Sequence, residues 1–132
     1  MSYAISEEAN GRVLMFAFSG VLTDAIALQA VQHALHYVDS HPPCAGIADF
    51  SQVTRFKVSA AIVTRLAASR PVIPATHMCI AVAPQDEVYG VSRMFQLRRG
   101  DIPNQIVIVR TMAEAWERLG LLNPHMIPVM LA

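Results

Sequence analysis

The spacing of apolar residues along the chain changes repeatedly between a strand-like and a helical pattern. Residues 2–8 and 12–19 are short strand-like runs, and Asn10-Gly11 between them favours a tight hairpin turn. From residue 25 the apolar positions recur every three or four residues, as on one face of a helix. Thr23 fits as the N-cap of this helix. The chain therefore opens with an antiparallel hairpin followed by an amphipathic helix.

The remainder of the chain continues this alternation. We predict strands over residues 45–50, 77–83 and 105–109, and helices over residues 59–69, 84–100 and 111–120. The run 77–83 is almost continuously apolar, which is typical of a central strand covered on both faces. Such an order predicts an α/β fold with a five-stranded, mostly parallel mixed sheet, β-β-α-β-α-β-α-β-α. We expect the antiparallel first strand at an edge of this sheet.

One domain accounts for residues 1–122, because no internal repeat or flexible linker interrupts them. Residues 123–132 form an apolar tail that two prolines keep from being helical. Burial of each of its large apolar side chains would stabilise the protein by about 1.5–3 kcal/mol. The tail should therefore pack on a surface, either that of its own domain or that of a second subunit.

The composition argues against several classes of protein. Of 132 residues, 54% are apolar, and ten basic side chains balance ten acidic ones. A protein without a basic excess is not expected to bind nucleic acid, because it cannot displace the counterions. We expect no secretory signal and no membrane span, since no apolar run approaches the ~18 residues that a span needs. These features predict a cytoplasmic protein. Cys44 and Cys79 lie in separate apolar segments, so buried free thiols are expected rather than a zinc or redox pair.

Ligands of open α/β sheets bind beyond the carboxyl ends of the strands. That rule directs attention to Asp49 and Ser51, and to Lys57 and Ser59, which lead into a predicted helix N-terminus able to hold an anion. Each has a structural alternative, in which Asp49 and Ser51 bond the loop backbone and Ser59 only caps its helix.

The third predicted helix offers two more candidates. Tyr89 and Arg93 share one of its faces and could project towards a ligand or partner, although a solvated face explains them as well. Arg98 and Arg99 at its end fit the helix dipole, with anion binding as the alternative.

The sequence contains few residues arranged for catalysis. His33 and His36 share a helix face, but no further metal ligand stands at suitable spacing, so we expect no metal site. Nucleotide-binding and hydrolase motifs are also absent from the sequence. We therefore predict a protein that is not an enzyme and carries no cofactor.

The element order and two apolar motifs carry a family resemblance. The segments are Ala45-Gly-Ile-Ala-Asp-Phe-Ser-Gln-Val-Thr-Arg-Phe and Val88-Tyr-Gly-Val-Ser-Arg-Met-Phe. With them the chain resembles the SpoIIAA-like branch of the STAS superfamily, the domains of sulfate transporters and anti-sigma-factor antagonists, which is related to the CRAL-TRIO lipid-binding fold. The likeness runs from about residue 3 to residue 121.

In the regulatory antagonists of that family, a partner kinase phosphorylates the first serine of an Asp-Ser-Ser-Gly motif at a helix start. The resemblance places Lys57-Val58-Ser59-Ala60 at this motif, with Val58 at the acceptor position and Ala60 in place of the glycine. Ser59 is then the candidate phosphoacceptor if the register slips by one residue.

Two functions follow from these observations. The first is a non-catalytic STAS-like interaction or regulatory module, homodimeric and able to dock a protein partner. The second is a binder of a small apolar or anionic ligand, lipid-like or nucleotide-like, at the carboxyl ends of the strands, around Asp49, Ser59 and Arg93.

Overall fold

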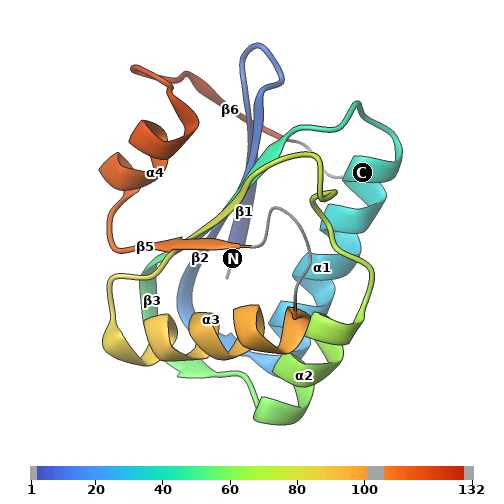
Figure 1. The fold of residues 1–132 in the computed structure, drawn as a ribbon, viewed down its shortest axis with the longest axis vertical. Helices are drawn as coiled ribbons and strands as arrows, with labels where there is room; N and C mark the ends of the chain where they lie inside the picture. The colour runs from blue at the N-terminus through green and yellow to red at the C-terminus, as the bar shows by residue number, and fades with distance from the viewer. Residues whose placement is uncertain (1–2, 101–105, 130–132) are drawn as a thin grey trace.

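A computed structural model describes residues 3–100 and 106–129, and it shows an α/β fold built on one mixed sheet (Figure 1). Within these residues it contains six strands and four helices. The strands are β1 (Tyr3–Glu8), β2 (Val13–Thr23), β3 (Ala45–Lys57), β4 (Cys79–Val82), β5 (Val107–Val109) and β6 (Met126–Pro128). The helices are α1 (Asp24–Asp39), α2 (Ala60–Ala68), α3 (Asp86–Arg99) and α4 (Met112–Leu119).

The predicted order of elements is confirmed as far as α4, but the predicted count of five strands is wrong. The sheet has the order β5-β4-β3-β2-β1-β6. Strands β2 to β5 are parallel, and β1 pairs antiparallel with both β2 and β6. Ser2 and Gln105, the first residues of two predicted strands, lie outside the described residues.

The apolar tail supplies the sixth strand. Ser6, Glu7 and Glu8 of β1 pair with Pro128, Ile127 and Met126. The prediction that β1 lies at an edge is therefore wrong, because the tail returns to cover it. Since β6 belongs to the same chain, the described part of the tail packs on its own domain. Residues 130–132 of the predicted tail lie outside the described residues.

Strand β3 runs further than its predicted end at residue 50. Between Ala17↔Asp49 and Ser19↔Gln52, β3 uses one residue more than β2, and a second shift follows at Gly20↔Val53 and Val21↔Arg55. Such bulges let a strand pass a locally unpaired residue without ending. The polar residues after Ala48 consequently mark a bulge and not the end of a strand.

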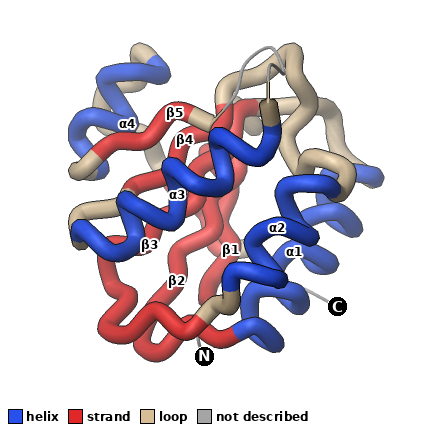
Figure 2. The backbone as a smooth tube through the Cα atoms, turned by 60° about the horizontal axis from the view of Figure 1, so that its bottom comes forward, coloured by secondary structure: helices blue, strands red, loops and turns tan. Residues whose placement is uncertain are grey.

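The helices cover the two faces of the sheet unequally. Figure 2 shows α1, α2 and α3 in front of the strands, with α4 set apart beside β5. Ala115 of α4 belongs to a cluster of buried residues with Ile47, Ile80 and Val82, and Trp116 packs against it. Side chains of a strand alternate between faces, so Gly46, Ala48, Cys79 and Ala81 lie on the opposite face, beneath the three other helices.

Helix starts follow the predicted caps. The side-chain hydroxyls of Thr23, Ser59 and Thr111 accept hydrogen bonds from the backbone N–H groups of Ile26, Ile62 and Glu114. Among the described residues, no helix has both the length and the apolar character needed to cross a membrane.

Candidate functional site

Asp49 and Ser51 stabilise the bulge in β3. Asp49 is 9% exposed, and its Oδ1 accepts hydrogen bonds from the backbone N–H of Ser51 at 3.0 Å and from the Ser51 hydroxyl at 2.5 Å. The side-chain amide of Gln85 donates to the carbonyls of Phe50 and Val53 at 3.2 and 3.0 Å. These bonds satisfy backbone groups that the bulge removes from the ladder.

Lys57 and Ser59 lie where β3 passes into α2, and both are exposed. The backbone N–H of Ser59 donates to Asp24 Oδ1 at 2.7 Å, which ties the start of α2 to the start of α1. Together with its capping bond, this gives Ser59 a structural role in the described part of the chain.

Tyr89 and Arg93 lie on α3 but have different neighbours. The guanidinium of Arg110 stacks over the Tyr89 ring at 4.0 Å from the centroid and donates to Asp86 at 2.9 Å. Exposed Arg93 donates to Gln96. The structure therefore does not bring the six predicted site residues together around one space.

An apolar hollow lies away from these six residues, and small residues of β3 and β4 form its floor. The register places Gly46 opposite Cys79 and Ala48 opposite Ala81 on neighbouring strands. Glycine has no side chain, and the three other side chains are small and face α1, α2 and α3. Leu14 and Phe16 of β2 continue the same two rows, since they pair with Gly46 and Ala48. The small residues therefore leave space between the centre of the sheet and the three helices.

Two adjoining apolar hollows occupy this space, with volumes of about 210 and 220 Å³. The first is lined by residues from the beginnings of β3 and β4, and the second extends past Ala81 to Phe56 and Val58. Their walls share Phe18, Val31, Ala48, Leu66, Cys79, Phe95 and Ile106. The six residues predicted from sequence line neither hollow. The space therefore begins at the amino ends of the parallel strands and continues under the helices.

The segment of residues 69–78 closes the first hollow at one side. A Cβ atom on Gly46 would lie only 2.4 Å from Ile73 Cγ1, so Ile73 packs directly on the glycine backbone. Ser69, Pro71, Val72 and Ala75 of the same segment also line the hollow. Glycine at position 46 is thus what allows this segment to approach the sheet.

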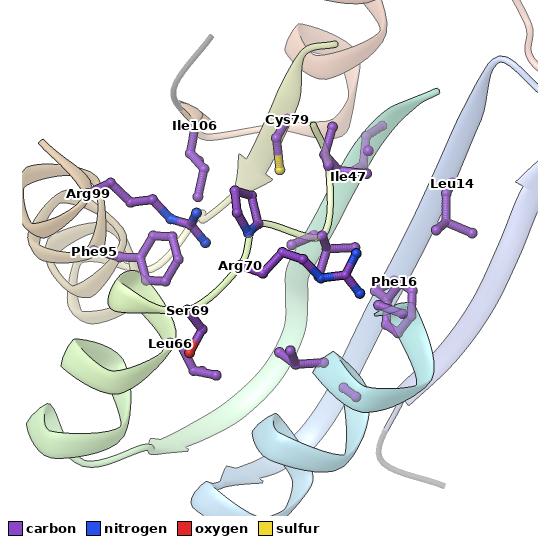
Figure 3. A pocket seen from close by; sticks show the side chains of 18 of the residues that line it. Leu14, Phe16, Ile47, Leu66, Ser69, Arg70, Cys79, Phe95, Arg99 and Ile106 are labelled. Atoms are coloured by element: carbon purple, nitrogen blue, oxygen red, sulfur yellow. The ribbon is translucent and has the colours of Figure 1, made fainter. Parts of the chain in front are cut away.

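Two arginines stand at the rim of the first hollow (Figure 3). Arg70 forms a bidentate ion pair with Asp39, at 3.0 and 3.1 Å. Arg99 points into the space beside Phe95 and Ile106 (Figure 3) and forms no such pair with the described residues. Burial lowers the pKa of Arg99, the nearby Cys79 acting in the opposite direction.

Both cysteines are free, as predicted, but each residue is partly exposed where buried thiols were predicted. Burial raises the pKa of the Cys79 thiol to about 11, against the smaller influence of Arg99. The thiol is therefore protonated at neutral pH and contributes to the wall as a small apolar group.

The histidines on α1 do not form a metal site in the described residues, where no group of three His, Cys, Asp or Glu side chains gathers. The Nδ1 atom of His33 lies within hydrogen-bond distance of the Tyr3 hydroxyl, which belongs to the cluster between α1 and the sheet. His41 stacks on Tyr37 with ring centroids 3.8 Å apart.

A scan against protein-family models finds no match for this chain, and a search of curated proteins finds none either.

Proposed function

We propose that this domain is a non-catalytic binding module that holds a small apolar molecule between its sheet and helices α1, α2 and α3. The observation that carries the proposal is the pair of adjoining apolar hollows over a floor of small side chains. An apolar cavity of about 150 Å³ already binds benzene. Each hollow exceeds that size.

The energetic argument points the same way. The apolar side chains around this space lack packing partners on the side that faces it, so they lose dispersion contacts there. A ligand that fills the space recovers about 0.8 kcal/mol for each methylene it buries. The fold therefore gains stability from an apolar occupant.

The family resemblance adds support at a coarser level. A STAS or SpoIIAA-like domain is a non-catalytic module, and the related CRAL-TRIO fold binds lipids. The space described above differs from the predicted site in position, because it begins at the amino ends of β3 and β4 and not at the carboxyl ends of the strands. We accordingly assign Asp49, Ser51, Lys57, Ser59, Tyr89 and Arg93 no part in ligand binding, and we propose no phosphorylation switch at Ser59.

A direct test uses 1-decanol as the probe and isothermal titration calorimetry as the measurement. The variant Ala48→Leu places extra carbons where both hollows meet, and it should weaken binding of 1-decanol at least tenfold. Ala4→Leu adds the same atoms at an exposed position of β1 and should leave the affinity unchanged. No binding to the wild-type protein, or equal binding to the Ala48→Leu variant, would refute the proposed function.

Self-association is the second candidate, as predicted from the apolar composition. One structural observation favours it: Leu97 and Leu122 are 71% and 93% exposed, and contact with a second copy would remove this apolar surface from water. The expected partner is a second copy of this chain. Sedimentation velocity should show a dimer that Leu97→Ser or Leu122→Ser weakens, and a monomer over the whole micromolar range would remove this candidate.

A further inference from the structure

Three arginines of this protein form ion pairs with acidic side chains, and Arg99 differs from them. Arg12, Arg70 and Arg110 form ion pairs with Glu8, Asp39 and Asp86. Arg99 forms no ion pair with any described residue, although it is partly buried and its Nε is enclosed without a hydrogen-bond partner. A buried donor of this kind is unfavourable unless an acceptor reaches it.

The direction of the side chain shows where that acceptor would lie. The guanidinium of Arg99 lies 4.9 Å from the centroid of the Phe95 ring. Phe95 lines both hollows, and Arg99 lines the first. Figure 3 shows the guanidinium turned from the end of α3 into this space. Compensation of the helix dipole would require neither the burial nor this direction, since a solvated arginine serves equally well.

We propose that Arg99 binds the carboxylate of a single-chain fatty acid whose hydrocarbon chain occupies the hollows under α1, α2 and α3. This inference rests on the proposed function, because it requires that the hollows hold a ligand. It adds the chemical class of that ligand and the residue that selects it.

The choice of a carboxylate follows from charge and shape. The planar guanidinium matches a carboxylate through two parallel hydrogen bonds. Arg70, the other arginine at the rim, is already neutralised by Asp39. Among the described residues that line the first hollow, Arg99 is thus the one cation without an acidic partner, and a single cation suits a monoanion better than a doubly charged phosphate. Scaled from the space that holds one benzene, the hollows suit a chain of roughly ten to sixteen carbons.

The experiment compares dodecanoate with 1-dodecanol, which have the same chain and differ in the charge of the head group. Binding to the intact chain is measured by isothermal titration calorimetry below the concentration at which dodecanoate forms micelles. The wild-type protein should bind dodecanoate about 10- to 100-fold more tightly than dodecanol, which corresponds to one charge-assisted hydrogen-bonded pair.

Variants then assign the preference to a residue. Arg99→Gln should reduce the affinity for dodecanoate to that for dodecanol and leave dodecanol binding unchanged, and Arg99→Lys should restore part of the preference. Arg98→Gln, at an exposed neighbouring position, is the matched control and should behave as the wild type. Circular dichroism of each variant checks that the fold is retained.

The outcomes separate the two proposals. Equal wild-type affinities for dodecanoate and dodecanol would overturn the role of Arg99 and leave the apolar site standing, without needing any variant. Tighter binding of dodecyl phosphate than of dodecanoate would overturn the carboxylate assignment. If neither dodecanol nor dodecanoate binds, both the proposed function and this inference fail.

Discussion

The substitution Ala48→Leu tests whether the space above the sheet is real. In a closely packed core, adding three carbons to an alanine is destabilising by about 1–3 kcal/mol, because neighbours must move. Ala48 lines both hollows, so here the added carbons enter unfilled space. At about 0.8 kcal/mol per buried carbon they contribute about 2 kcal/mol. Loss of side-chain freedom removes about 0.5–1 kcal/mol of this.

We therefore expect Ala48→Leu to raise the free energy of unfolding by about 1–1.5 kcal/mol, and Tm by roughly 3–6 °C. Urea unfolding followed by circular dichroism measures this change, with an unchanged m value showing that the transition itself is the same. Ala115→Leu is the control. Ala115 is fully buried against the other face of the sheet and lines neither hollow, so its substitution should destabilise the protein.

The sign of the effect decides the matter. If Ala48→Leu lowers the free energy of unfolding as Ala115→Leu does, the space under the helices is not available to added atoms. The argument for a ligand there would then lose its physical basis.

Three further substitutions test other parts of the structure. Gly46→Val should displace Ile73, lower the free energy of unfolding by about 1–3 kcal/mol and speed proteolytic cleavage within residues 69–78; unchanged cleavage would show that the segment does not depend on the glycine. The hydrogen bond from Arg12 holds the pKa of the Glu8 carboxyl at about 2, below its ordinary 4.5, so its stabilising contribution is present above pH 4.5 and disappears as the pH falls towards 2. Glu8→Gln should therefore lose less stability than the wild type between pH 4.5 and pH 2 in urea titrations, and parallel curves would contradict this. Ser59→Ala should cost about 1 kcal/mol through loss of the N-cap while calorimetry shows unchanged ligand affinity; weaker binding would return Ser59 to the site.

Much of the fold was predictable because its signals are local. Thr23, Ser59 and Thr111 cap the helices that they were expected to cap, since an N-cap needs only a side-chain oxygen and a nearby backbone N–H. Pro71 and Gly100 likewise mark positions beyond the ends of α2 and α3. Four helices and the parallel core of the sheet followed from such signals and from hydrophobic periodicity.

The errors concern features that depend on distant parts of the chain. The continuation of β3 past Phe50 requires that Asp49 and Gln85 satisfy the backbone of the bulge, and Gln85 lies 35 residues beyond Phe50 in sequence. The sixth strand arises because β1 offers an unpaired edge to a short apolar tail that contains Pro128. A residue-by-residue pattern does not contain these pairings.

The candidate site was predicted least well. The small residues Gly46, Ala48, Cys79 and Ala81 are visible in the sequence as two alternating pairs. Only the register of β3 with β4 shows that they lie opposite one another and form one floor. Arg99 was noted at the end of its helix with anion binding as an alternative, but its direction depends on packing against Phe95.

The central claim is that the space between the sheet and helices α1, α2 and α3 holds a ligand. A crystal structure of the protein grown with dodecanoate tests this most directly. We predict continuous electron density for the chain over Ala48 and Cys79, with the carboxylate at the guanidinium of Arg99. Density for dodecanoate only on the outer surface, with protein side chains filling the space above Ala48, would contradict the account.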